Sequence, residues 1–313
     1  MSKVISNSDI LFLYDAKLCN PNGDPDDENK PRMDYERSVN LVSDVRLKRY
    51  LRDYFQWKGQ EVFVAKQDDK SVTATDRIKK LLETDKIKAL STEQIEELLN
   101  HLIDVRLFGA TMPLKSEEGK GSSNTFTGPV QFNWGYSLNK TRLVDSSGIT
   151  SHFSSESAME QGTMGKDYRV YYSLIAFHGI VSAKRGEKTF LKSDDLELLD
   201  ESMVKAIPLL ATRSKIGQYP RLYLRLEYVD EFTFLGDLRS CLQISPNSDT
   251  LRDIKELSLD VTLLCERLID SKQKIKKVYC WQDSQLKLEG IREHNNFAAF
   301  LTKAGFSVQT LSV

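Results

Sequence analysis

The stretch Val170-Tyr-Tyr-Ser-Leu-Ile-Ala-Phe-His-Gly-Ile-Val181 gives the strongest strand signal in the sequence. It is rich in aromatic and β-branched residues, and such a run is typical of a strand buried within a sheet. Two other segments have a similar character. Residues 10–18 are apolar and aromatic, and in residues 221–228 three leucines alternate with polar or aromatic side chains, the pattern of a half-buried strand.

Helices are predicted between these strands. Leu47, Leu51, Tyr54 and Phe55 share one face of a helix over 35–57, and acidic residues open a second helix over 194–210. The remaining predicted elements are a helical insertion within 73–108, a helix over 261–269 and a strand over 276–281. This order predicts an α+β fold of the ferredoxin-like kind, with an antiparallel sheet backed by helices.

Three polar segments interrupt this pattern. Residues 19–34 contain three prolines, one glycine and three asparagines, which predicts an irregular loop with defined turns. Residues 115–124 are rich in glycine and serine, so a mobile loop is expected there. Residues 140–167 are polar and have few apolar anchors, and a segment of this length without a core is usually functional or disordered.

The composition is that of a globular protein. The chain has 313 residues, 40% of them hydrophobic, and 44 Lys and Arg stand against 45 Asp and Glu, a net charge of −1. Taken alone, this balance argues against a nucleic-acid binder. No apolar run is long enough to cross a membrane, and four widely spaced cysteines indicate free thiols, so we expect a cytoplasmic protein.

The charges are nevertheless clustered along the chain. Residues 30–58 carry eight basic and four acidic side chains, whereas residues 24–28 carry four acidic ones. Three shorter basic clusters are Arg213, Lys215, Arg221 and Arg225; Lys184, Arg185, Lys188 and Lys192; and Lys272, Lys274, Lys276 and Lys277. A phosphate backbone requires repeated cations at reachable spacing, although a single cluster is more often a solvated face.

Catalytic and cofactor motifs are not apparent. The four histidines are scattered, His178 is expected to be a core residue, and no nucleophile elbow, phosphate-binding glycine loop or metal-ligand pattern occurs. The run 24–28 lacks the glycine of a calcium loop. We therefore expect no cofactor and no metal, and carboxylate catalysis by Asp15 or Asp24 stays open as an alternative.

A series of motifs resembles the backbone subunit family of type I CRISPR Cascade complexes, most closely the type I-B and I-C branches. The N-terminal motifs are Asn20-Pro-Asn-Gly-Asp-Pro25, Pro31-Arg-Met-Asp34 and Ser43-Asp-Val-Arg-Leu-Lys-Arg49. The later ones are Asp104-Val-Arg-Leu-Phe-Gly109, Gly128-Pro-Val-Gln-Phe132, Met164-Gly-Lys166, Tyr172, His178-Gly179, Val181-Ser-Ala183 and Asp194-Asp-Leu-Glu-Leu-Leu199. The matches run from about residue 10 to about residue 230, in the order of the family.

The resemblance implies one elaborated domain of the RAMP superfamily with an RNA-recognition-like palm (1–58, 109–138 and 169–313). Helical fingers (about 59–108) and a thumb-like loop (about 139–168) would be inserted into this palm. The implied function is to bind CRISPR RNA as several copies along the guide, within a Cascade complex with other subunits. The guide would then pair with target DNA, so that base pairing reads the sequence while the protein holds the backbone.

The resemblance also implies that particular residues contact RNA and that Met164 inserts as a wedge between bases. By motif position these residues are Asn20, Asn22, Arg32, Ser43, Arg46, Lys48, Arg49, Gln131, Met164 and Lys166. Arg32 has a structural alternative, an ion pair with Asp34 or Glu36 that would hold the loop.

Two functional alternatives remain at this point. Related type III backbone subunits cut target RNA with a loop aspartate, which would make Asp24 or Asp15 catalytic. The other alternative is a monomeric RNA-binding module outside CRISPR systems. We expect a non-catalytic protein, because the motifs follow the type I pattern.

Overall fold

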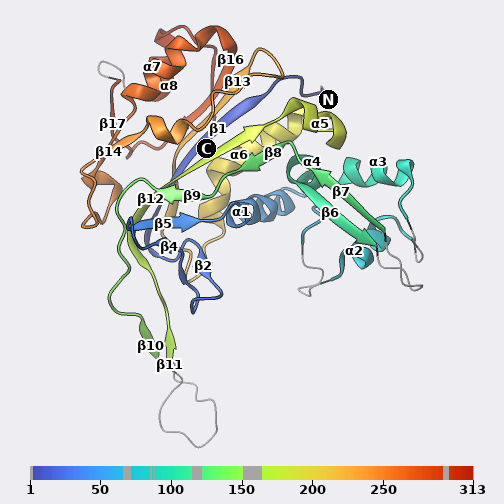
Figure 1. Cartoon of the computed structure of the whole chain (residues 1–313), viewed down its shortest axis with the longest axis horizontal. Coiled ribbons are helices and arrows are strands. Elements are labelled where there is room, and N and C mark those ends of the chain that lie inside the picture. The colour runs from blue at the N-terminus through green and yellow to red at the C-terminus, as the bar shows by residue number, and fades with distance from the viewer. Residues whose placement is uncertain are drawn as a thin grey trace, which may run out of the picture.

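Three long antiparallel strands form the centre of the molecule (Figure 1). The computed structural model describes residues 3–65, 72–84, 87, 89–114, 122–150, 164–291 and 296–312. Strand β1 (Ser8–Cys19) lies between β12 (Val170–Val181) and β13 (Gln218–Tyr228), and Phe12 pairs with Phe177 on one side and with Tyr223 on the other. The three predicted strands are therefore confirmed, and they are neighbours in one sheet.

The full sheet has nine strands in the order β18-β16-β13-β1-β12-β9-β5-β4, and β8 also pairs with β12. Only β16 and β18 pair in parallel among the described strands of this sheet. The chain order β1, α1, β8, β12, α6, β13 is the βαββαβ order of ferredoxin-like folds, which confirms the predicted fold class. The outer strands are β4 (Met33–Asp34), β5 (Val39–Val42), β8 (Val130–Phe132), β9 (Gly135–Ser137), β16 (Ile275–Gln282) and β18 (Val308–Thr310).

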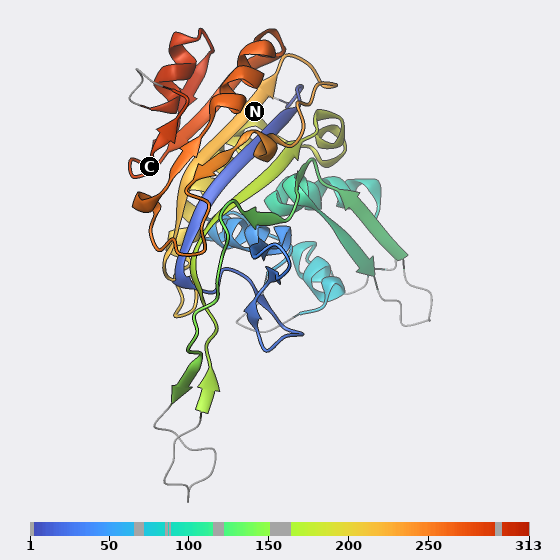
Figure 2. The ribbon, with the colours of Figure 1, turned by 60° about the vertical axis from the view of Figure 1, so that its left-hand side comes forward.

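Alternating side chains of β1 enter two separate cores. Phe12 and Tyr14 pack in one core beneath α1 (Asp44–Trp57) and α6 (Ser193–Leu209). Leu11 and Leu13 pack in the second core, because successive side chains of a strand point to opposite faces. The C-terminal layer that supplies this second core contains η1 (Leu238–Cys241), α7 (Thr262–Asp270) and α8 (Phe297–Lys303). Helices therefore cover both faces of the sheet (Figure 2).

Helix α1 begins later than predicted. The sequence predicts a helix from residue 35, but the helix starts at Asp44, and Val39–Val42 forms β5 instead. Ser43 is the N-cap, and its hydroxyl accepts a hydrogen bond from the backbone N–H of Arg46. The apolar residues before Ser43 form β5 and pair with β9, so they are not part of the helix. The start predicted at residue 35 is therefore wrong.

The helical insertion has its own core. It contains α2 (Ala74–Leu81), α3 (Thr92–His101) and α4 (Ile103–Phe108), and α3 begins with a capping box formed by Ser91 and Gln94. The hairpin of β6 (Gly109–Leu114) and β7 (Ser122–Thr127) contributes Met112 and Leu114 to this core. The core of this insertion therefore includes side chains of the hairpin that follows α4. Residues 115–121 of the expected loop lie outside the described residues.

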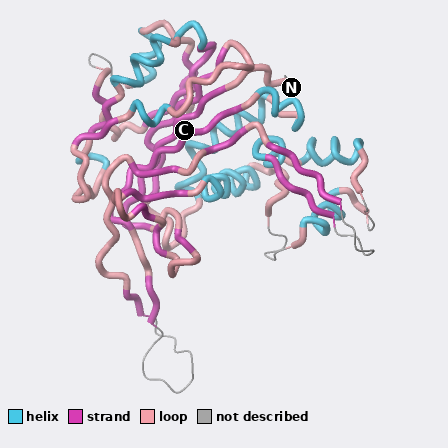
Figure 3. Tube along the Cα trace, in the orientation of Figure 1, coloured by secondary structure: helices cyan, strands magenta, loops and turns pink. Residues whose placement is uncertain are grey.

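A two-stranded ribbon leaves the sheet where the thumb-like loop is expected (Figures 1 and 3). It is formed by β10 (Gly148–Thr150) and β11 (Met164–Lys166), and residues 151–163 lie outside the described residues. Asn139 fixes its base, since the buried amide donates to the Tyr172 carbonyl and accepts from the Leu174 N–H at 2.8 Å.

The remaining short elements connect these parts. They are β2 (Gly23–Asp24), β3 (Lys30–Pro31), α5 (Ala183–Thr189), β14 (Gln243–Ser245), η2 (Ile254–Glu256), β15 (Ser258–Asp260), η3 (Lys272–Lys274) and β17 (Leu288–Glu289). The predicted helix at 261–269 and strand at 276–281 correspond to α7 and β16. None of the helices in the described ranges has the length and apolar character that a membrane span requires, and all four cysteines are free.

A buried ion pair joins the helical insertion to the palm. The Arg106 guanidinium makes two hydrogen bonds with the Asp195 carboxylate, at 2.9 and 2.8 Å, and donates to the Leu99 and Asn100 carbonyls. Since both side chains are 5% exposed, loss of either would leave a buried charge without a partner.

We predict that Asp195→Ala lowers the free energy of unfolding by about 3–5 kcal/mol, because it strands the Arg106 charge in the interior. Urea denaturation followed by circular dichroism measures this loss. The double variant Arg106→Met/Asp195→Leu should lose less, since it removes both charges at once. Equal losses in the two variants would contradict this explanation, because the double variant leaves no charge stranded.

Candidate nucleic-acid interface

Two asparagines of the turn-rich loop hold that loop against the palm. The Asn22 Oδ1 accepts hydrogen bonds from the Ser43 N–H at 2.8 Å and the Ser43 hydroxyl at 2.9 Å. The buried Asn20 amide donates to the Asn29 carbonyl at 2.7 Å. The structure thus brings Asn20, Asn22 and Ser43 together near the N-terminus of α1, where their hydrogen bonds fix the conformation of the loop.

Arg46 and Lys215 form the most unusual charge arrangement at this surface. The Arg46 guanidinium lies over the Tyr50 ring, 3.9 Å from its centroid, and the Lys215 ammonium donates to the Asn20 carbonyl. Both side chains are half-buried, and neither makes an ion pair with a carboxylate in the described part of the chain. Burial, and then the charge of Arg46, lower the pKa of Lys215 to about 8. An anion at this place would relieve both effects.

The other cations of α1 already have partners. Lys48 is buried and contacts the Asp44 carboxylate at 3.2 Å and the Gln131 Oε1 at 3.1 Å. Burial lowers the pKa of Lys48. Arg49 is half exposed and pairs with Asp53 at 2.7 Å. Lys48 and Gln131 are thus neighbours, as one site would require, whereas Arg49 is paired with Asp53 at a half-exposed position.

Arg32 makes the structural contact that the sequence left open, but with another partner. Its guanidinium pairs with Asp24 at 2.9 Å, not with Asp34 or Glu36, because the pairing of β2 with β3 turns residues 23–24 back toward residues 30–31. The guanidinium also lies 5.6 Å from the Trp134 ring centroid.

The base of the thumb-like ribbon is tied to the acidic run 24–28. The Lys166 ammonium pairs with the Glu28 carboxylate at 2.9 Å, and the Tyr168 hydroxyl donates to the same carboxylate at 2.6 Å. Only the backbone of Met164 is described, opposite Thr150 in the ribbon. The acidic run therefore neutralises nearby cations, which include Arg32 and Lys166.

The carboxylates of the nuclease alternative are held in ion pairs. Asp15 is 2% exposed, pairs with Arg221 at 2.9 Å and accepts a hydrogen bond from the Tyr172 hydroxyl. Burial raises the pKa of Asp15 to about 6. Asp24 is occupied by Arg32. Within the described residues no three metal-ligating side chains gather into a site.

The basic cluster 213–225 does not form one patch. Arg221 and Arg225 are buried in ion pairs with Asp15 and Asp200, because they lie within β13. Arg213 and Lys215 precede the strand and reach the surface near the Asn20 loop. Lys215 belongs to a basic cluster of the sequence, but it was not among the residues predicted to contact RNA. Its position before a strand, and not within one, was the sequence signal that could have separated it from Arg221 and Arg225.

Two comparisons with known proteins point to the same family. Residues 6–262 match the family model described as CRISPR-associated protein Cas7. The chain is 34% identical over 332 residues to a Haloferax volcanii protein named CRISPR-associated protein Cas7, an alignment that covers 99% of this chain and 97% of the relative.

A solved structure described as a CRISPR RNA-guided surveillance complex, pre-nicking, contains a chain of similar fold. Its TM-score is 0.52 at 13% identity, with 96% of this chain and 99% of that chain covered. The family predicted from the motifs is confirmed by the family model and by the extent of the match to the curated relative. The chain belongs to the family of CRISPR-associated protein Cas7.

Proposed function

We propose that this protein binds CRISPR RNA as a backbone subunit of a type I Cascade-type complex. The observation that carries the proposal is the half-buried pair of cations, Arg46 and Lys215, which lack carboxylate partners in the described chain. Phosphate groups are the anions that a guide RNA would supply there. The relative named CRISPR-associated protein Cas7 and the surveillance complex of similar fold support this assignment.

The architecture favours contacts to the RNA backbone over contacts to bases. An open sheet of an RNA-recognition fold stacks bases on its aromatic side chains. Here both faces of the central strands are buried, so the guide would run along the loop, helix terminus and ribbon base at the end of the sheet. Guide bases held only through their backbone stay available for pairing with target DNA.

We further propose that several copies bind one guide, together with other Cascade subunits, in the cytoplasm. The projecting ribbon of β10 and β11 supports a contact between copies, because it extends beyond the protein's own core (Figure 3). A protein with this role has no chemical step to perform, and we propose that it is not an enzyme.

Reversing the charges of Arg46 and Arg49 together should weaken binding to a repeat–spacer RNA by roughly tenfold to a hundredfold, because charged hydrogen bonds to phosphate are lost. Filter binding over a range of salt concentrations measures this loss. The salt dependence should also become shallower by about 1.4 in slope for two lost contacts.

The variant Lys255→Glu/Lys287→Glu is the matched control, because it reverses two exposed lysines of the C-terminal layer. Equal weakening by both double variants would contradict a specific phosphate site. Sedimentation of the wild-type complex should show several copies on each RNA, and a single copy would favour the monomeric alternative.

Guide binding should also depend on pH through Lys215. Since a phosphate favours the charged ammonium, its pKa rises on binding from about 8 in the free protein. Affinity should be constant below this pH and fall above it, by at most about tenfold per pH unit. Anisotropy titrations from neutral to alkaline pH measure the effect. Lys215→Met should bind weakly at every pH, whereas Lys215→Arg should bind well and lose the pH dependence.

The nuclease alternative predicts cleavage of complementary RNA by the guide-loaded protein. We expect intact RNA after incubation with divalent cations, because Asp15 and Asp24 are engaged by arginines. Denaturing gels detect the products. Regularly spaced fragments that disappear in Asp24→Ala would overturn the assignment as a non-catalytic subunit.

A further inference from the structure

The two basic clusters that the guide surface does not use meet at the opposite end of the sheet. In the β-sheet register, Ser8 at the start of β1 lies opposite Val181 at the end of β12 and Glu227 near the end of β13. Helix α5, which carries Lys184, Arg185 and Lys188, follows β12 directly. The start of β16 lies at the same end, since Lys277 pairs with Glu227. Segments far apart in sequence therefore converge here (Figure 1).

Ion pairs connect these segments into one surface. Lys3 reaches Glu187 on α5 at 2.9 Å, Lys184 reaches Glu231 at 2.6 Å, and Lys276 reaches Glu227 at 2.7 Å. These three carboxylates are thereby neutralised. We name this region the distal basic surface, and its members are Lys3, Lys184, Arg185, Lys188, Lys276 and Lys277.

Three cations of the distal basic surface remain without a carboxylate. Within the described ranges, Arg185, Lys188 and Lys277 make no ion pair, and the Lys277 ammonium lies over the Tyr279 ring at 4.9 Å. Arg185 and Lys188 are exposed on α5. Cations without carboxylate partners therefore remain at this end, although Glu197 lines the hollow between the segments and Asp230 lies near Lys274.

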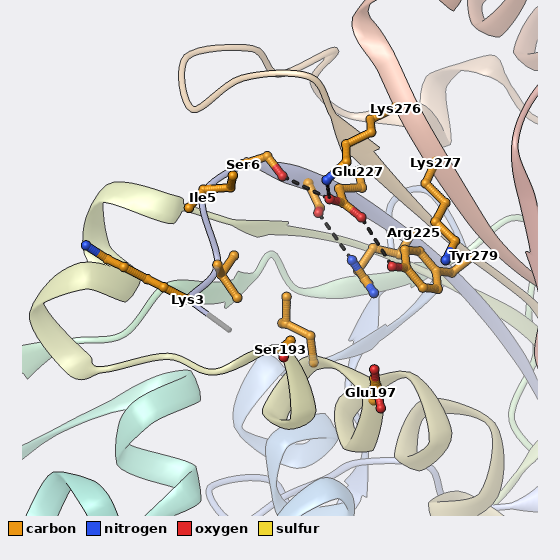
Figure 4. A pocket seen from close by; sticks show the side chains of 13 residues that line it. Lys3, Ile5, Ser6, Ser193, Glu197, Arg225, Glu227, Lys276, Lys277 and Tyr279 are labelled. Atoms are coloured by element: carbon orange, nitrogen blue, oxygen red, sulfur yellow. Dashed lines mark hydrogen bonds and ion pairs between the residues drawn. The ribbon is translucent and has the colours of Figure 1, made fainter. Parts of the chain in front are cut away.

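The hollow gives this surface a concave centre (Figure 4). It has a volume of about 390 Å³ and lies between the N-terminal segment, the start of α6 and strands β13 and β16. Its polar lining includes Lys3, Ser6, Ser193, Lys276 and Tyr279. Hydroxyl and ammonium groups around a hollow can contact successive phosphates of a strand.

Exposed aromatic rings flank the same cations. Phe232 is 78% exposed, and the Lys184 ammonium lies 5.7 Å from its ring centroid. Phe190 is 42% exposed and occupies the left-handed backbone region with φ 57°, directly after α5. Large exposed rings beside cations are what a single-stranded nucleic acid requires, because its bases stack on rings while its phosphates meet the cations.

We propose that the distal basic surface binds a second single strand of nucleic acid, distinct from the guide. The twelve residues of β1 separate it from the Asn20 loop by roughly 36 Å, so one nucleotide cannot reach both. This inference rests on the proposed function, since pairing of the guide with one DNA strand releases the other. The displaced DNA strand is single-stranded, and it needs contacts that do not depend on sequence.

The experiment uses protein that is first saturated with repeat–spacer RNA. A fluorescent oligothymidylate of about thirty nucleotides, which cannot pair with the guide, is then titrated, and binding is followed by anisotropy at several salt concentrations. Arg185→Glu/Lys188→Glu should weaken this binding at least tenfold and flatten its salt dependence. Phe232→Ala should weaken it about fivefold or more with an unchanged salt slope, because a ring and not a charge is lost.

The variant Lys255→Glu/Lys287→Glu is again the matched control and should bind the oligothymidylate as the wild type does. Guide affinity, measured in parallel, should stay within about twofold in Arg185→Glu/Lys188→Glu, which separates this proposal from the proposed function. Unchanged oligothymidylate binding in that variant would overturn the proposal. Loss of copies from the guide with DNA binding intact would also overturn it, and would identify the surface as a protein interface.

Discussion

The burial of β1 on both faces is the constraint on which the rest of the structure depends. Phe12 and Tyr14 face one core and Leu11 and Leu13 the other, so the central strands are covered on both faces by other parts of the described chain. Ligands are therefore restricted to the ends and edges of the sheet, where loops, helix termini and the thumb-like ribbon emerge. The turn-rich loop, α1 and the ribbon base meet at one such end.

Ion pairing then decides which cations are available at those ends. Arg221 and Arg225 stabilise the interior through Asp15 and Asp200, and Arg106 joins the helical insertion to the palm through Asp195. A net charge of −1 is the sum over internal ion pairs, acidic side chains elsewhere on the chain and cations that lack partners. Since the cations without partners are the ones that attract phosphate, the overall charge is a poor guide to nucleic-acid binding in this chain.

The two ends of the sheet differ in how their cations are buried and in which side chains surround them. Near Asn20, half-buried cations lie among side chains that are fixed by hydrogen bonds, an arrangement suited to holding one strand in a defined register. At the distal basic surface the cations are exposed and lie beside exposed phenylalanines, which suits contacts that tolerate any sequence. The length of the sheet's strands thus separates the two nucleic-acid contacts that we propose.

The sequence by itself determined the strands, most of the helices and the family. Alternation along residues 221–228 and the apolar runs 10–18 and 170–181 depend on local periodicity, and the motifs from Asn20 to Leu199 are linear patterns. The start of α1 was misplaced because pairing of β5 with β9, a contact distant in sequence, overrides local helix periodicity. Only the tertiary structure distinguished Lys215 from Arg221 and Arg225, which share one basic cluster. The reason is physical: whether a cation is free or paired depends on carboxylates that strand register brings from elsewhere, and no local pattern specifies that register.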